Sequence, residues 1–194
     1  MNRSLNRKLI RDYTYYQETL DDVKDISKEA EGLFRDALNK DYKKALEALV
    51  PNKDSDSKKS ENEEDESVHF EDKTFKKLFR KLAVKCHPDK LVNGYSEREK
   101  EFLKKCYENL TLANSTYDWG LLLKTAVELD VDIPDLSEDH ISNIKENIEK
   151  IKENISKYEQ SMAYKWYEMG ADESKKEYLQ QCAGIFMNSL NKKD

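Results

Sequence analysis

Residues 74–90 read TFKKLFRKLAVKCHPDK, and this stretch predicts a helix followed by a tight turn. Its apolar positions are Phe75, Leu78, Phe79, Leu82 and then either Val84 or Cys86. Their steps of three and four are typical of one face of an amphipathic helix. Pro88 has no backbone N–H and disfavours helical backbone at His87, so the helix should end at about Cys86. His87, Pro88 and Asp89 should then lie exposed on the turn.

The remaining face of this helix is strongly basic, although the whole chain carries a net charge of -6. Its cations are Lys73, Lys76, Lys77, Arg80, Lys81 and Lys85, and no acidic residue interrupts them. A cationic face attracts an acidic partner surface over a long range. A merely solvated face and a nucleic-acid patch are the alternatives. The nucleic-acid patch is disfavoured because no helix-turn-helix or zipper accompanies the helix.

A second helix is expected to return along the first. Ser96 and Glu99 have the spacing of a capping box, which predicts a helix that begins near Ser96. Its apolar face would contain Phe102, Leu103, Cys106, Leu110 and Ala113. This face could pack antiparallel on the apolar face of the first helix, so residues 70–129 are expected to form one compact helical segment.

The chain before this segment predicts a long helix and a linker. Apolar residues recur at helical spacing from Leu9 to Ala37, and residues 39–41 should end that stripe. Asp41 would cap a further short helix, which Pro51 ends. Residues 52–67 (NKDSDSKKSENEEDES) have no apolar side chain and cannot build a core, so they are expected to be a disordered acidic linker.

The chain after the central segment predicts two more helices. Ser137 has the features of an N-cap, and an a/d heptad pattern follows it. The pattern consists of Ile141, Ile144, Ile148, Ile151, Ile155, Tyr158 and Met162. Gly170 would end this helix, and Asp172 would cap a last helix over residues 172–190. We expect the N-terminal and C-terminal stripes to pack together as a helical bundle or coiled coil, with the last helix as a third member. A homo-oligomer formed through residues 141–162 is the alternative.

These elements predict an all-α fold. The chain has 194 residues but only five Gly and three Pro, which are too few for the many turns of an all-β fold. It also lacks the apolar runs of buried parallel strands. The expected segments are an N-terminal helical arm (1–51), the linker (52–67), the central hairpin domain (68–130) and a C-terminal helical hairpin (131–194).

The spacing of the three cysteines indicates whether they form a metal site or disulfides, and in which cellular compartment the protein lies. Cys86, Cys106 and Cys182 lack the paired spacing of a zinc site or a disulfide framework, which predicts free thiols in a reducing compartment. No apolar run has the length of a signal-peptide core or a membrane span. We therefore expect a cytoplasmic or nuclear protein that holds no metal and binds no membrane.

The sequence offers no credible enzyme centre and no cofactor site. No Ser/His/Asp arrangement, glycine-rich phosphate loop or clustered carboxylate pair is credible as an active site. His69 and His140 have no neighbours at metal-ligand spacing, so no role is assigned to them. Trp119 and Trp166 are expected to be packing residues between helices.

Residues 76–90, KKLFRKLAVKCHPDK, resemble the J domain of DnaJ-type co-chaperones. The paired basic residues, the aromatic residue, the Arg-Lys-Leu-Ala core and the HPD turn with a following lysine all fall in register. The resemblance covers about a third of the chain. In the returning helix Tyr107, Leu110 and Ala113 fit the family's spacing, and Phe102 is a competing choice for the aromatic position.

The chain also departs from the family pattern. Only residues 67–70 precede the basic helix, so the family's first helix is truncated or replaced. No Gly/Phe-rich linker and no cysteine-rich zinc region occur. The resemblance is therefore to a J domain with otherwise unrelated flanks.

The resemblance implies a function in which this chain performs no chemistry itself. J domains bind the ATP-bound seventy-kilodalton heat-shock chaperone of the DnaK type and stimulate its ATP hydrolysis. The matching positions are His87, Pro88 and Asp89 at the turn, with Lys76, Lys77, Arg80, Lys81, Lys85 and Lys90 around it. The helical arms would give specificity for a client, which the sequence does not identify, or for a location. The competing function is a structural or scaffold protein that uses the hairpin as a docking module.

Overall fold

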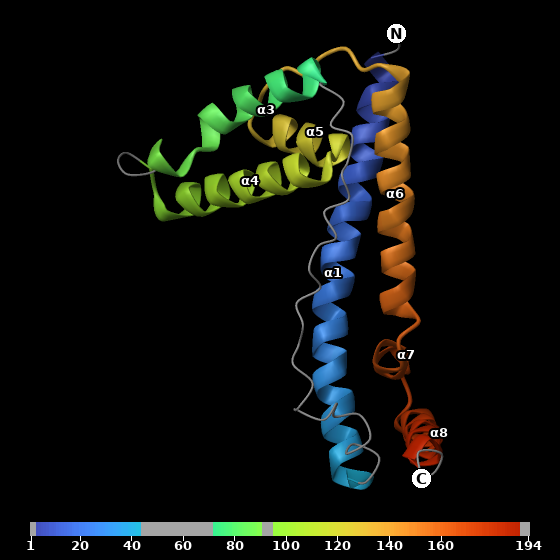
Figure 1. The fold of residues 1–194 in the computed structure, drawn as a ribbon. Helices are drawn as coiled ribbons and strands as arrows, with labels where there is room; N and C mark the ends of the chain where they lie inside the picture. Colours follow the sequence, from blue (N-terminus) through green and yellow to red (C-terminus); the bar gives the residue numbers. More distant parts are fainter. Residues whose placement is uncertain (1–2, 44–71, 91–94, 191–194) are drawn as a thin grey trace. The chain divides into compact units, whose positions relative to one another are not determined.

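The computed structural model describes residues 3–43, 72–90 and 95–190, and all regular structure in these ranges is helical. The α-helices are α1 (Arg3–Asp41), α3 (Lys73–Cys86), α4 (Glu97–Thr116), α5 (Trp119–Glu128), α6 (Glu138–Glu159), α7 (Met162–Glu168) and α8 (Asp172–Leu190). A single 3-10 turn, η1 (Pro88–Lys90), follows α3. The predicted all-α fold is confirmed (Figure 1). The linker at 52–67 and most of the short helix expected after Asp41 lie outside the described residues.

The chain divides into two compact units, and two helices contribute to both. The first unit consists of residues 1–18 and 68–153, and the second of residues 19–67 and 154–194. Helix α1 therefore belongs to the first unit up to Glu18, and helix α6 up to Glu153.

The centre of the first unit is an antiparallel hairpin of α3 and α4 with α5 packed against it (Figure 1). The ring of Phe75, at the start of α3, lies 5.0 Å from the ring of Tyr117, just beyond the end of α4. At the other end of α3 the ring of His87 lies 5.5 Å from Tyr107. The predicted return of the second helix along the first is thus confirmed.

Local sequence accounts for the ends of these helices. The Asp72 carboxylate accepts the N–H groups of Thr74 and Phe75 and so caps α3. Ser96 and Glu99 form the predicted capping box at the start of α4. Helix α3 ends at Cys86, where Pro88 was expected to stop it.

Burial in the hairpin core resolves the choice between Val84 and Cys86 and tests the predicted apolar face of α4. Cys86 is fully buried whereas Val84 is 60% exposed, so Cys86 completes the apolar face of α3. Leu110 and Ala113 of α4 are buried as predicted. Phe102 is 45% exposed, so its expected place on the packed face of α4 is wrong. Phe102 lies in the second turn of α4, before the buried residues Cys106, Leu110 and Ala113, and at helical spacing it falls at the edge of the face that they form.

The first turns of α1 are tied to the start of α5 by Tyr13. Its hydroxyl donates to Asp118 Oδ2 at 2.7 Å, and Asp118 also caps α5 by accepting the N–H of Leu121. The ring of Tyr13 lies directly over Gly120, where a Cβ atom would collide with the ring. Only glycine permits this close approach of helix and ring. Trp119 beside it is fully buried, which confirms its predicted packing role.

Helix α6 also packs in the first unit. The isoleucines of its predicted stripe are all buried: Ile141, Ile144, Ile148 and Ile151 in this unit, and Ile155 in the second unit. Lys152 Nζ lies 4.8 Å from the ring centroid of Tyr16, which places α1 and α6 side by side in this unit. The heptad pattern was expected to continue to Met162, but α6 ends at Glu159 and Met162 begins α7. Ser161 caps the new helix by accepting the N–H of Tyr164, which explains the break.

The second unit has its own small core. It is formed by Ala30, Phe34 and Leu38 of α1, Ala163 of α7, and Leu179, Cys182 and Ala183 of α8. Trp166 packs edge-to-face on Phe34 with ring centroids 5.6 Å apart, as its predicted packing role requires. The last helix therefore joins a bundle, as expected. Self-association through residues 141–162 stays a prediction.

Candidate functional site

The HPD turn follows α3: His87 ends the helix, and Pro88 and Asp89 belong to the 3-10 turn η1. His87 has extended backbone (φ -61°, ψ 132°), which turns the chain out of the helix. The N–H of Asp89 donates to His87 Nδ1 at 3.3 Å, and Asp89 Oδ2 lies 3.4 Å from the same nitrogen. The side chain of Asp89 is 88% exposed. Contacts within the turn thus orient the imidazole of His87, while the carboxylate of Asp89 remains accessible to a partner protein.

Tyr107 of α4 supports the turn from the opposite helix. Its ring meets the His87 imidazole edge-to-face, at 5.5 Å between centroids and 79° between planes. The His87 side chain remains 42% exposed. Of the two aromatic residues that competed for this position, Tyr107 contacts the turn, whereas Phe102 is exposed without a described aromatic partner.

Four of the predicted docking cations, all on α3, are exposed and unpaired among the described residues. Lys76, Lys77, Arg80 and Lys81 are all exposed, and none lies within 4.0 Å of a carboxylate among the described residues. They repeat at a spacing of four, so they line one face of the helix. Lys90 is the last residue of the 3-10 turn. We name the four cations of α3 together with residues 87–89 the hairpin site.

Lys85 is placed differently from the other predicted docking cations. Its ammonium donates to the carbonyl oxygens of Leu129 at 2.8 Å and Asp130 at 3.2 Å. These carbonyls follow the last turn of α5, where a helix lacks internal donors and favours a cation. Lys85 therefore joins the last turn of α3 to the end of α5. Its ammonium group is hydrogen-bonded within the fold, unlike the other predicted docking cations of α3.

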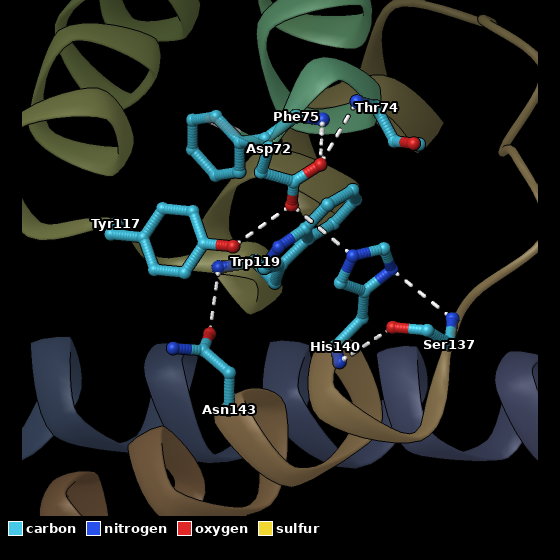
Figure 2. A network of polar contacts seen from close by, with 8 residues as sticks. All are labelled: Asp72, Thr74, Phe75, Tyr117, Trp119, Ser137, His140 and Asn143. Carbon is cyan, nitrogen blue, oxygen red and sulfur yellow. Dashed lines mark hydrogen bonds and ion pairs between the residues drawn. The ribbon is translucent and has the colours of Figure 1, made fainter. Parts of the chain in front are cut away.

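A second polar cluster, which the sequence did not reveal, lies at the opposite end of the hairpin (Figure 2). Asp72 Oδ2 accepts the Tyr117 hydroxyl at 2.8 Å and lies 3.1 Å from His140 Nε2. The side chains of Asp72 and His140 are only 11% and 12% exposed. This Asp72–His140 pair joins the start of α3 to the first turn of α6.

The surroundings of His140 define its tautomer and orientation. The N–H of Ser137 donates to His140 Nδ1 at 3.1 Å, so in the neutral ring the proton lies on Nε2 and faces Asp72. The imidazole stacks on Trp119 at 4.1 Å between centroids. Ser137 Oγ in turn accepts the N–H of His140, which confirms Ser137 as the N-cap of α6. Asn143 of the next turn accepts the N–H of Trp119 at 3.1 Å.

The Asp72 carboxyl is held in its charged form. Burial raises its pKa, but the hydrogen bonds from Phe75, Tyr117 and Thr74 and the nearby His140 lower it by more. The net pKa of Asp72 lies below its ordinary value. The sequence assigns no role to Asp72, because its partners at positions 117 and 140 come together only in the folded chain.

The buried thiols of the hairpin are poor nucleophiles. Burial, with the Glu128 carboxylate 3.9 Å from Cys106 Sγ and with Cys86 nearby, raises the pKa of Cys106 to about 12. Burial also raises the pKa of Cys86. Among the described residues no group of His, Cys, Asp and Glu side chains is arranged to hold a metal ion. Nor does a helix in the described ranges have the length and apolar character to cross a bilayer.

The chain matches no protein-family model and no curated protein, and no solved structure matches its fold.

Proposed function

We propose that the chain is a J-domain co-chaperone, which binds a DnaK-type seventy-kilodalton chaperone through the hairpin site and stimulates its ATP hydrolysis. The observation that carries the proposal is the geometry of the HPD turn. An exposed Asp89 carboxylate lies at the end of an antiparallel hairpin whose first helix presents four unpaired cations. The contact of Tyr107 with His87 also supports the register that the resemblance assigns to the returning helix.

The physical roles of the two parts of the site differ. The cations of α3 would steer the hairpin toward an acidic surface of the chaperone, which mainly raises the association rate. Asp89 would then accept charge-assisted hydrogen bonds from an arginine of the chaperone. Binding of this kind acts on the partner's conformational equilibrium, so the chain needs no catalytic group of its own.

The test compares steady-state ATPase rates of a DnaK-type chaperone with the full chain and its variants. His87→Gln and Asp89→Asn should each abolish stimulation and leave the helical content unchanged, because both side chains are solvent-accessible. Lys77→Glu with Arg80→Glu should weaken binding mainly through slower association. The matched control is Lys104→Glu with Lys105→Glu, which makes the same charge change on exposed positions of α4 and should stimulate normally.

A scaffold function makes a different prediction. A chaperone that binds the chain equally well with His87→Gln, and without a change in ATPase rate, would show that the hairpin only docks. Equal stimulation by the wild type and by His87→Gln would refute the co-chaperone proposal itself.

A further inference from the structure

The first unit contains an open, mainly apolar groove that the hairpin site does not use. It has a volume of about 1040 Å³. One wall is a stripe of α1, formed by Arg7, Ile10, Arg11, Thr14, Tyr15 and Glu18. Val127 of α5 and Ile133 of the α5–α6 connection complete it. The groove therefore lies along about three turns of α1, a length of about 16 Å.

Tyr15 and Val127 are the exposed apolar side chains that line this groove. Helix α5 is buried from Trp119 to Ala126, yet Val127 is 56% exposed. Tyr15 is 63% exposed, whereas Ile10, which also lines the groove, is buried. Tyr15 of α1 and Val127 of α5 thus present exposed apolar surface on two helices that line one concave groove, the shape into which the apolar face of a helix docks.

The charged side chains that line the groove indicate the charge of the partner that it binds. Arg7 and Arg11 are exposed, lie one helical turn apart, and have no carboxylate within 4.0 Å in the described part of the chain. Residues 3–11 carry four cations and no acid, and the unpaired N–H groups at the start of α1 add to the positive potential. Glu18 is the single acid in this groove, at its other end. A second hollow, lined by Asp130, Asp132 and Asp135, shares Arg7 and the apolar side chains other than Tyr15 with the groove, so Arg11 is the cation that lines the groove alone.

We propose that this groove binds an amphipathic helix of another protein, with an apolar face and two carboxylates one turn apart. The apolar face would cover Tyr15 and Val127, at the i, i+3, i+4 and i+7 spacing by which helices fill such grooves. The two carboxylates would pair with Arg7 and Arg11, because guanidinium groups bind carboxylates in a planar, two-pronged geometry. This surface shares no residue with the hairpin site, so the inference does not depend on the proposed co-chaperone function.

The test uses a fluorescein-labelled helical peptide of about 16 residues, with Leu and Phe on one face and Glu on the flanks, titrated with the full chain by fluorescence anisotropy. A second peptide carries Lys in place of Glu. The wild type should bind the Glu peptide at least about tenfold more tightly than the Lys peptide. Arg7→Glu with Arg11→Glu should reverse that preference, and Val127→Ser should weaken the binding of both peptides.

The controls separate this groove from other surfaces. Lys8→Glu places the same kind of charge change on α1 at an exposed position outside the groove, and it should keep the wild-type preference. His87→Gln should bind both peptides as the wild type does. Failure of both peptides to bind, or equal effects of Lys8→Glu and the Arg7/Arg11 reversal, would overturn the proposal. A dimer that the Arg7/Arg11 reversal dissociates would assign the groove to a second copy of the chain and overturn it too.

Discussion

The Asp72–His140 pair provides the sharpest test of how the hairpin is fixed to the rest of its unit. We predict that Asp72→Ala lowers the free energy of unfolding of the first unit by about 3 to 4 kcal/mol. Loss of the cap on α3 costs about 1 kcal/mol. Loss of the hydrogen bonds from Tyr117 and His140 to a charged acceptor costs about 1.5 to 3 kcal/mol each, and these terms overlap because one carboxylate serves all of them.

A control substitution at another N-cap and a tryptophan in the first unit make the unfolding measurement specific to the Asp72–His140 pair. Ser96 caps α4 in the same way, but its groups are exposed, so Ser96→Ala should cost only about 1 kcal/mol. The chain has two tryptophans, Trp119 in the first unit and Trp166 in the second. In a Trp166→Phe background, urea unfolding followed by fluorescence therefore reports the first unit through Trp119.

The coupling between the two partners completes this test. Asp72→Ala and His140→Ala should be non-additive by about 1 to 2 kcal/mol, because each removes the same interaction. If Asp72→Ala costs no more than Ser96→Ala and the double-mutant cycle is additive, the buried pair does not hold α3 to α6, and the reasoning fails.

Three further predictions follow from single contacts. The pKa of Asp72 is lower in the folded chain than its ordinary value near 3.9. The charged Asp72 carboxylate therefore stabilises the fold above about pH 4, and this contribution is lost as the pH falls through the folded pKa. Asp72→Asn should flatten this acidic part of a plot of unfolding free energy against pH. Gly120→Ala should cost about 1 to 3 kcal/mol through collision with the Tyr13 ring, and measurably less in a Tyr13→Leu background, whereas an equal cost in both would rule out that collision. Cys106, with a pKa of about 12, should react with an aromatic disulfide reagent at pH 8 only upon unfolding; rapid labelling of the native chain would contradict its burial.

The helices were predictable because their signals are local. The stop at Pro88, the capping box at Ser96 and the apolar stripe of α6 each depend on a few neighbouring residues, and each is found where it was expected. The turn of the hairpin site was predictable for the same reason. The extent of the α6 heptads was not, because Ser161 caps a new helix that the apolar spacing alone does not reveal.

The contacts that fix the first unit were beyond sequence reasoning because they join distant positions. Asp72 meets Tyr117 and His140, 45 and 68 positions later in the chain, and His140 had been assigned no role. Lys85 has the same residue type and spacing as the free cations beside it, yet it caps the end of α5. Charge and periodicity describe the surface of a helix, but which part of that surface is used inside the fold depends on the helices that pack beside it.

These tertiary contacts place the residues that stabilise the fold at one end of the hairpin and the residues proposed to bind a partner at the other end. Asp72 and Tyr117 lie at one end of the α3–α4 pair, where Phe75 meets Tyr117, and they bind it to α6. His87 and Asp89 lie at the other end, where Tyr107 supports the turn and the Asp89 carboxylate is exposed. Substitutions at the first end should therefore change unfolding free energies, and substitutions at the second end should change partner binding with the fold intact. Lys85 is the exception, because it lies beside the turn while binding the carbonyls after α5, so it alone should affect both properties.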